Sequence, residues 1–315
     1  MCYSAMVDQS RKSLIRDFGA TFDERAFEEL MRARLDDHRI SMPRALEANF
    51  DDPQDESDRR FRDWILAHRD RESRAMESEL FKQTKRLADA ERALATKETK
   101  TQREHQRIAT QKIPWLKEKM RDLKRADSKP RDSQIFPNDY TAVIVNVDGQ
   151  RLIRPMRYNL RPPFMDADLK GAYNARRDNL AQFWKGQFGT SHAILVMTSF
   201  FEHVSRHVYE HRELGPEEKE QDVILHFNPQ PPTRMYVVCL WSHWERPGVP
   251  ALESFAAITD EPPPEVRETG HDRCVVPIKV ENIDAWLTPR GRSKEELFAI
   301  LDDRPRPYYE HRLAA

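Results

Sequence analysis

The chain has 315 residues, and its 52 Lys and Arg nearly balance its 53 Asp and Glu. This length can bury the core of one large or two small domains, and the balanced charge excludes a chain that is basic throughout. The three cysteines, Cys2, Cys239 and Cys274, lack zinc-site or disulfide-framework spacing, so we expect a reducing compartment and no metal. We also expect no cofactor. No apolar run approaches the length of a membrane span, and the first residues lack a signal-peptide pattern. We therefore expect a cytoplasmic protein, associated with the nucleoid if the source is bacterial.

The second residue, Cys2, is the first candidate for chemistry. Its side chain is small enough for Met1 to be removed, and the mature chain would then begin with an amine and a thiol on adjacent carbons. The reference pKa of an α-amine is about 7.7 to 8.0, so roughly a tenth of such amines are free base at neutral pH. An aldehyde would form a Schiff base with this amine, and the sulfur would then close a thiazolidine ring. Cys2 is therefore a candidate nucleophile toward aldehydes.

Residues 23–125 have a helical pattern that is rich in charge and free of glycine. Apolar residues recur with heptad spacing at Leu80, Leu87, Leu94 and Ile108, and the weaker companion stripe is Met76, Gln83, Ala90 and Lys97. This pattern predicts one or two long solvated helices, with a hairpin as one arrangement, rather than a strong two-stranded coiled coil. Pro53 and Pro114 are expected to break the helices. Twelve basic and five acidic residues lie between Lys97 and Arg131, so this half of the region is basic.

After the helical region the pattern becomes extended. Expected strands cover residues 141–147, 151–158, 192–200, 235–241, 254–259 and 275–280. Asp148-Gly149 suits a type I′ turn between the first two strands. Closely spaced strands with few helices between them predict an α+β fold with a mostly antiparallel, barrel-like β domain. We assign residues 1–20 and 132–315 to this domain and residues 21–131 to a charge-rich helical insertion.

Four short segments of the β-rich part hold candidate functional residues. In chain order these are Arg157, Tyr158, Phe164, Asn174, Arg176, Glu202, His271 and Arg273. Arg157, Tyr158 and Phe164 lie where an expected strand runs into a Pro-rich loop. Asn174 and Arg176 open a helix expected over residues 173–185. Glu202 ends an apolar strand, and the last two follow a loop. Each residue type also occurs in ordinary caps, strand ends and exposed loops, so their order along the chain carries the argument.

Together with Cys2, these segments resemble the SRAP family, the SOS response-associated peptidases. That family opens Met-Cys-Gly-Arg, and its later signatures read approximately Arg-Trp-Gly-Leu-x-Pro-x-Trp, Asn-Ala-Arg-x-Glu, Gly-Phe-Tyr-Glu-Trp and His-x-Arg-Met-Pro. The matching stretches here are residues 157–164, 174–178, 199–203 and 271–275. Departures from the family pattern are Tyr3-Ser4, Tyr158-Asn159, Phe164, His203 and Cys274-Val275. The resemblance covers about residues 1–20 and 132–310 and leaves the helical region as an insertion.

The resemblance implies a DNA-damage protein that cross-links covalently, through a thiazolidine at Cys2, to abasic sites in single-stranded DNA. The implied catalytic residues are Cys2 as nucleophile, Asn174 holding the N-terminus, Glu202 transferring protons and His271 assisting sugar opening. The implied DNA-binding residues are Arg157, Tyr158, Phe164, Arg176 and Arg273. Arginines would contact phosphates, and the aromatic rings would stack on bases. Strand cleavage as a lyase and peptidase self-processing are further activities that the resemblance implies.

Two alternatives use the same residues differently. In a cysteine-type peptidase or autopeptidase, Cys2 would attack an amide, with His271 as base and Glu202 as the carboxylate that orients it. In the other alternative the chain is a non-catalytic scaffold for nucleic acid or protein. The helical insertion would then offer a surface for a protein partner or for self-association. The enzymatic readings differ in the electrophile, because a peptidase must also stabilise a tetrahedral oxyanion.

Overall fold

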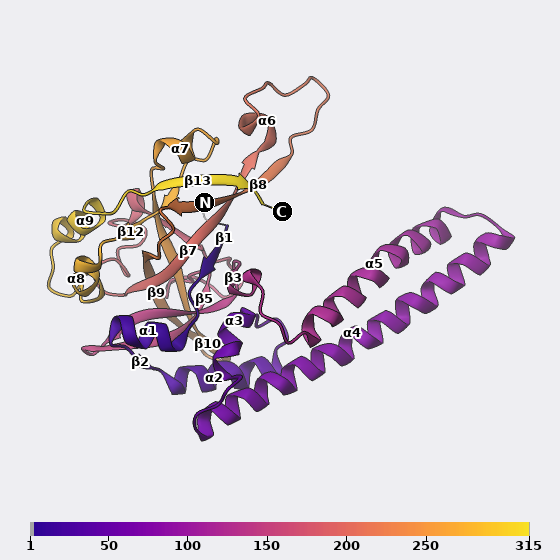
Figure 1. The fold of residues 1–315 in the computed structure, drawn as a ribbon, viewed down its shortest axis with the longest axis horizontal. Coiled ribbons are helices and arrows are strands. Elements are labelled where there is room, and N and C mark those ends of the chain that lie inside the picture. The colour runs from indigo at the N-terminus through magenta and orange to yellow at the C-terminus, as the bar shows by residue number, and fades with distance from the viewer. Residues whose placement is uncertain (1–2, 315) are drawn as a thin grey trace. The chain divides into compact units, whose positions relative to one another are not determined.

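A computed structural model describes residues 3–314 of the chain. It divides into two compact units. The β-rich unit takes the described residues of Met1–Leu30, Ile40–Asp52 and Pro130–Ala315, and the helical unit takes Met31–Arg39 and Pro53–Lys129. Figure 1 shows the strands gathered in the first unit and two long helices in the second.

The β-rich unit is built on one large sheet that closes partly on itself. Its strands are β1 (Ser4–Val7), β2 (Thr21–Phe22), β3 (Gln134–Ile135), β4 (Tyr140–Val147), β5 (Gln150–Tyr158), β6 (Asn174–Arg176), β7 (His192–Ser205), β8 (Asp222–Gln230), β9 (Met235–Arg246), β10 (Val249–Asp260), β11 (Cys274–Val275), β12 (Pro277–Ile278) and β13 (Tyr308–Leu313). The order β9-β10-β5-β4-β7 returns to β9, because β7 also pairs with β9. Most pairings are antiparallel, and the parallel ones join β5 and β6 to β10 and β2 to β5. The predicted α+β class with a barrel-like, mostly antiparallel sheet is confirmed.

Local sequence signals predicted the central hairpin well. Val147 pairs with Gln150 at the end of the antiparallel β4–β5 ladder. Between them Asp148 has φ 51° and Gly149 has φ 84°, the two positive values that a type I′ turn requires. Strands β7 and β9 run several residues beyond their predicted ends, and the predicted strand over 275–280 is two short strands, β11 and β12. Strands β8 and β13, which pair with each other, were not predicted.

The prediction of a helix over residues 173–185 is wrong. Residues 174–176 form β6, which pairs in parallel with β10, and a short 3-10 helix (Arg177–Asn179) and turns follow it. The backbone carbonyl of Tyr173 accepts a hydrogen bond from the N–H of Ala257. Backbone groups that pair with a neighbouring strand are not available for a helical ladder, so the tertiary contact overrides the local pattern.

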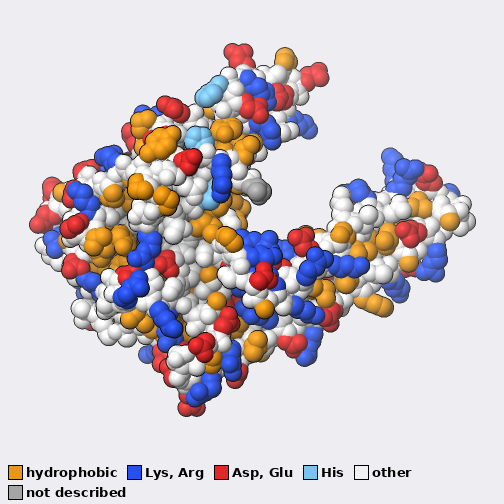
Figure 2. Space-filling model, viewed as in Figure 1, with side chains coloured by type: hydrophobic (Ala, Val, Ile, Leu, Met, Phe, Trp, Pro, Cys, Tyr) orange, Lys and Arg blue, Asp and Glu red, His pale blue; other side chains and the backbone are white. Residues whose placement is uncertain are grey.

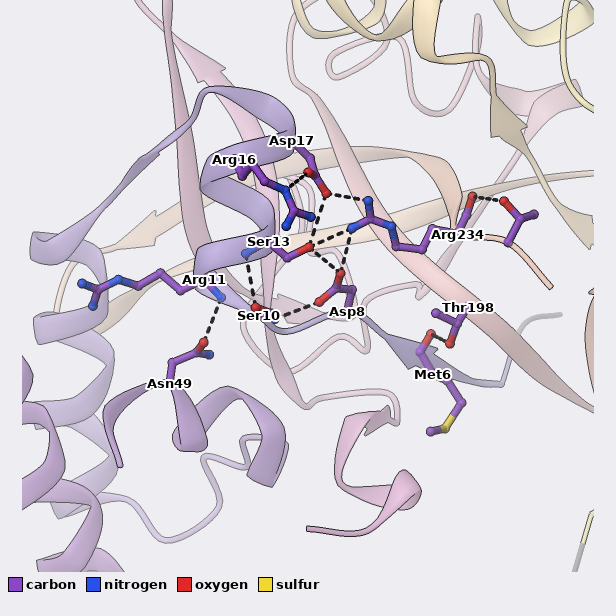
Figure 3. Close-up of polar contacts among 11 residues, drawn as sticks. Met6, Asp8, Ser10, Arg11, Ser13, Arg16, Asp17, Asn49, Thr198 and Arg234 are labelled. Carbon is purple, nitrogen blue, oxygen red and sulfur yellow. Dashed lines mark hydrogen bonds and ion pairs between the residues drawn. The ribbon is translucent and has the colours of Figure 1, made fainter. Parts of the chain in front are cut away.

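An arginine clamp holds the N-terminal part of the chain against the sheet (Figure 3). Arg234 Nη1 lies 3.0 Å from Oδ2 of Asp8 and donates to the hydroxyl of Ser13 at 2.8 Å. Its Nη2 lies 2.5 Å from Oδ2 of Asp17. Hydrogen bonds from Arg16 and Arg234 lower the pKa of Asp17 to about 2. The clamp therefore fixes the segment that leads out of β1, the strand that runs beside β7.

The β-rich unit also contains short helices, and the second unit consists of two long helices and the end of α2 (Glu24–Asp36). The helices are α1 (Arg11–Phe18), α2 (Glu24–Asp36), α3 (Arg44–Glu47), α4 (Glu56–Thr96), α5 (Lys100–Lys124), α6 (Arg206–Tyr209), α7 (Pro264–Arg267), α8 (Ile283–Leu287) and α9 (Lys294–Asp302). None of the helices found within residues 3–314 is both long enough and apolar enough to cross a membrane.

Helices α4 and α5 form a hairpin, as the charge-rich helical pattern allowed (Figure 1). Pro53 precedes α4 as a break, but α5 continues through Pro114, so the predicted break there is wrong. Ala109 and Leu116 are buried on either side of Pro114, and this packing keeps the helix continuous. The buried positions of α4 include Gln83 and Ala90, which belong to the stripe that looked weaker in the sequence.

The fold predicts that the hairpin is sensitive to side-chain volume at Ala90. This residue is fully buried, so Ala90→Leu must displace its neighbours, and overpacking of this kind typically costs about 1–3 kcal/mol. We expect a lower thermal midpoint for loss of the helical circular-dichroism signal. Ala88→Leu is the matched control, because Ala88 lies on the same helix but is exposed. An equal effect of the two substitutions would contradict close packing at Ala90.

Candidate active site

Strand β7 carries Glu202 into the interior of the β-rich unit. Side chains alternate between the two faces of a strand, so Glu202 lies on the same face as the core residues Phe200 and Val204. The relative exposure of Glu202 is 0%. An ionised carboxylate is costly at such a position, so the surroundings favour the neutral form of this side chain.

The His271 ring reaches Glu202 from the loop that follows α7. Nε2 of His271 lies 3.3 Å from Oε2 of Glu202. On the other side of the ring, Nδ1 lies 2.8 Å from the carbonyl oxygen of Arg273, closer than the 3.4 Å to the Arg273 backbone nitrogen. A carbonyl oxygen only accepts, so we assign the proton of the neutral ring to Nδ1. Nε2 then presents its lone pair to Glu202.

A glycine sets the position of this loop. Gly270 has φ +91°, and a Cβ atom there would lie 2.5 Å from Cγ1 of Val208. Residues with a side chain rarely adopt this backbone conformation, and the space beside it is already filled. The loop that delivers His271 is thus packed against α6, which follows β7 in the chain.

Burial shifts both groups of the pair toward their neutral forms. It raises the pKa of Glu202 to about 8, although the backbone N–H of Tyr3 acts in the opposite direction. Burial also lowers the pKa of His271 below its usual value, while the carbonyl of Arg273 acts in the opposite direction. Near neutral pH the pair therefore consists of a carboxylic acid and a neutral imidazole. The proton that the two groups share at their contact then resides on the carboxyl group.

Two more polar side chains lie buried on neighbouring strands. Asn174 is 9% exposed. In the parallel pairing of β6 with β10, Asn174 lies opposite Ala257 and Arg176 lies opposite Thr259. Asn174 and Thr259 therefore project from the same face of the sheet. Among residues 3–314, neither the Asn174 amide nor the Thr259 hydroxyl has a hydrogen-bond partner. Because buried polar groups are normally paired, these two mark a place where a bound group could be held.

The register of β10 brings these residues to the His271 loop. Strand β11, which follows that loop, pairs with Thr259 and Asp260 at the end of β10 where β6 also pairs. The structure thus brings Glu202 and His271 into direct contact and Asn174 to the same end of the sheet. Thr259 was missed in the sequence. Its only signal there is a hydroxyl at the end of the apolar run over 254–259.

The two arginines expected to contact phosphate meet at one carboxylate. Nη2 and Nε of Arg176 lie 2.6 and 3.2 Å from the two carboxylate oxygens of Asp178. Nη2 of Arg273 lies 3.5 Å from Oδ2 of the same carboxylate. The hydrogen bond from Arg176 lowers the pKa of Asp178. The Asp178 carboxylate is thus held between two guanidinium groups, which bind carboxylate and phosphate oxygens with similar geometry.

Tyr158 is buried and Arg157 is partly buried, although both were expected to contact DNA at the surface. Burial lowers the pKa of Arg157, and its Nη2 donates to the carbonyl oxygen of Asn159 at 3.2 Å. The Tyr158 ring is fully buried, stacked on Phe255 with centroids 5.2 Å apart and edge-on to Tyr173 at 5.8 Å. Stacking of Tyr158 on a base would require the ring to leave this core.

Phe164, in contrast, is presented on the surface. It is 63% exposed and lies edge-on to Phe183, itself 46% exposed, with centroids 5.7 Å apart. The loop is held in place because Trp244 Nε1 donates to the carbonyl of Met165 at 2.8 Å and Arg246 Nη2 donates to that of Pro163 at 2.7 Å. Phe183 was missed because its segment was expected to be helical. The two rings together form an exposed apolar patch.

The described chain begins next to the buried pair. The backbone N–H of Tyr3 donates to the carbonyl oxygen of Phe201 at 3.2 Å, and Ser4 pairs with Phe201 in the β1–β7 ladder. The Tyr3 ring lies edge-on to His203 at 4.3 Å. Cys2, the expected nucleophile, lies outside the described residues. Within residues 3–314 no group of three His, Cys, Asp or Glu is arranged to hold a metal ion.

The raised pKa of Glu202 predicts a stability change with pH that Glu202→Gln removes. The ordinary value of a Glu pKa is 4.5, and the folded value here is about 8, so the folded chain binds an extra proton between these values. The stabilising effect of this proton is complete below about pH 4.5 and is lost as the pH rises to about 8. We expect the Tm difference between Glu202→Gln and wild type to shift in favour of the variant across this range.

Glu217→Gln is the control for this measurement, because it removes an exposed carboxylate and is expected to leave the pH profile unchanged. A Tm difference between Glu202→Gln and wild type that stays constant with pH would contradict a protonated Glu202.

The chain was compared with family models, with curated proteins and with solved structures. A model of the SOS response associated peptidase (SRAP) family matches residues 90–313. No curated protein matches the chain. Among solved structures, a Bacteroides thetaiotaomicron protein (structural genomics target BtR8) is 14% identical, with a TM-score of 0.44, over 58% of this chain and 77% of its own. A Bordetella bronchiseptica protein (target BoR19) is 17% identical, with a TM-score of 0.46, over 61% of this chain and 90% of its own. A phage-related protein from the same organism is 15% identical, with a TM-score of 0.44, over 57% of this chain and 80% of its own.

The family match covers more than two thirds of the chain and includes every candidate residue of the site except Cys2. It begins at residue 90, inside the region that we assign to the insertion. The chain belongs to the SRAP family, the SOS response associated peptidases.

Proposed function

We propose that this protein forms a covalent cross-link to abasic sites in single-stranded DNA through the amine and thiol of Cys2. The observation that carries the proposal is the buried contact of 3.3 Å between Glu202 and His271, next to the start of the described chain. A ring-opened abasic site exposes an aldehyde, and Cys2 without Met1 would offer an amine to attack it. The pair would supply the proton transfers that this reaction needs.

The first step joins the Cys2 nitrogen to the aldehyde carbon. The amine attacks as a free base, and the resulting carbinolamine loses water to form an imine. The hydroxyl leaves as water only if it gains a proton, and a carboxylic acid with a pKa of about 8, such as Glu202, is well matched to give one near neutral pH. His271 accepts and returns protons through Nε2 and assists opening of the sugar ring.

The second step closes the ring. The Cys2 sulfur adds to the imine carbon, the new carbon–sulfur bond completes a thiazolidine, and the thiol proton passes to the nitrogen. Nothing is oxidised or reduced in either step. The open hydrogen-bonding groups of Asn174 and Thr259 would hold the N-terminus or the sugar hydroxyls during these steps. Loss of the proton next to the imine carbon would instead break the strand by β-elimination, which is the lyase side reaction.

The surroundings of the site suit an extended single strand. Arg176 and Arg273 would bind backbone phosphates, and Phe164 with Phe183 would stack on a base that is not paired. Arg157 would hold the loop that carries Phe164 in place through its hydrogen bond to the carbonyl oxygen of Asn159. Self-processing, which the family name suggests, would expose the same amine. Aldehyde capture is the function that a protonated Glu202 supports more directly.

The proposal predicts that the cross-link depends on both functional groups of Cys2. Wild-type protein mixed with an abasic oligonucleotide should give a band that survives heat and denaturant, and an intact oligonucleotide should give none. Cys2→Ala keeps the amine but cannot close the ring. It should lose the stable band and retain only a Schiff base that borohydride traps.

Two further variants sharpen this test. An extra residue between Met1 and Cys2 separates the amine from the thiol and should abolish the stable band. Cys274→Ala removes a buried thiol and should leave the band in place. A full-strength band from Cys2→Ala or from the extended chain would contradict the mechanism and point to a lysine or to an internal cysteine.

The position of Asp178 predicts that it competes with DNA phosphate for the two arginines. Asp178→Asn removes the negative charge that Arg176 and Arg273 share. Since exposed ion pairs are weak, we expect about a two- to fivefold increase in affinity for an intact single strand. The measurement is fluorescence anisotropy at low salt, with Asp166→Asn in the neighbouring exposed loop as control. Weaker binding would show instead that Asp178 orients the arginines for the strand.

A further inference from the structure

The two units carry opposite net charges. Residues 31–39 and 53–129, which form the helical unit, contain 24 Lys and Arg and 17 Asp and Glu. The rest of the chain contains 28 Lys and Arg and 36 Asp and Glu. The helical unit is therefore positive by seven charges, and the β-rich unit is negative by eight. A net negative unit repels the DNA backbone at long range, so attraction of nucleic acid must come from local arginines or from the helical unit.

Helix α5 concentrates the positive charge. It has eight Lys and Arg against three Asp and Glu. Several of its cations form ion pairs, including Lys112 with Glu79 and Arg107 with Glu104, both at 2.6 Å. Others, namely Lys100, Lys117, Lys119 and Arg121, have no ion-pair partner within residues 3–314. In the view of Figure 2, Lys and Arg side chains are distributed along the hairpin.

An exposed tryptophan lies among these cations. Trp115 is 51% exposed, and the ammonium nitrogen of Lys119 lies 5.9 Å from the centre of its ring. Ile108, Lys112, Trp115 and Lys119 are spaced so that they share one face of α5. A shallow hollow of about 440 Å³ is lined by Ile108, Gln111, Lys112 and Trp115. We name this face of α5 the Trp115 face.

The hairpin does not need this ring for its own packing. The buried side chains of α5 are Ala109 and Leu116, and they lie on a different face of the helix from Trp115. An indole left half in water beside lysines is the combination that binds single-stranded nucleic acid, because the ring stacks on any base and the cations contact the phosphates. The positive net charge of the whole unit favours this occupant over a protein partner.

We infer that the Trp115 face of α5 binds single-stranded nucleic acid, with Trp115 stacking on a base and Lys119 contacting the backbone. This inference and the proposed function both involve single-stranded nucleic acid and are otherwise independent. It assigns the helical unit an affinity for the strand that needs no abasic site. A strand bound there would be held near the protein while an abasic site is searched for.

The test uses the full chain and a single strand of about 20 thymidine nucleotides without an abasic site. Trp115→Ala should weaken binding about tenfold, and Trp115→Phe should restore much of the loss because a phenyl ring also stacks. Lys119→Ala should lower the slope of log affinity against log salt by about 0.7, the value expected for one lost phosphate contact on a single strand. Indole fluorescence should be quenched by the strand in wild type and much less so in Trp115→Phe.

Phe81→Ala is the matched control, because Phe81 is 73% exposed on α4 and is followed by basic residues in the same way. It should bind the strand as wild type does. Unchanged affinity of Trp115→Ala, or an equal loss in Phe81→Ala, would overturn the inference and leave the Trp115 face to a protein partner. A wild type that binds the intact strand through Trp115 but forms no adduct with an abasic strand would remove the proposed function and keep this inference.

Discussion

The buried contact between Glu202 and His271 constrains how strand β7 and the loop after α7 meet in the β-rich unit. A carboxyl group at 0% exposure is tolerated only as the neutral acid or with a close partner, and the partner comes from a loop almost seventy residues later in the chain. Gly270 allows that loop to turn against α6, and the Arg234 clamp fixes the segment that follows β1. Strands β1, β7 and β11 thus bring distant parts of the sequence together around the contact between Glu202 and His271.

The same burial disfavours a salt bridge between the two groups and favours their neutral forms. Desolvation raises the pKa of Glu202 and lowers that of His271, so each group resists the charged form that an ion pair would require. The polar side chains near this buried pair fall into two groups. Asn174 and Thr259 keep unfilled hydrogen-bonding positions, whereas Arg176 and Arg273 are already engaged by Asp178. Neighbouring residues of the site therefore differ in burial, in charge and in how fully their hydrogen bonds are satisfied.

The sequence was sufficient where local rules decide the structure. The Asp148-Gly149 turn, the strands on either side of it and the charge-rich helices follow from positive φ and from hydrophobic period. Long-range pairing decided the rest. Asn174 lies in a strand because β10 takes its backbone hydrogen bonds, and Tyr158 lies in the core because its strand pairs on both sides. The order of short motifs pointed to Glu202 and His271, but Thr259 and Phe183 carry no comparable signal and emerged only from register and exposure.

The mass of the N-terminal peptide after reaction with an abasic strand would show directly whether Cys2 carries the cross-link. The reacted protein would be digested with nuclease and protease, and the peptide that ends in the first cleavable residue would be fragmented. The account predicts a peptide that lacks Met1 and carries the deoxyribose remnant on Cys2, with a mass equal to the sum of the parts less one water. A peptide that retains Met1, or a remnant found on a lysine, on Cys239 or on Cys274, would contradict it.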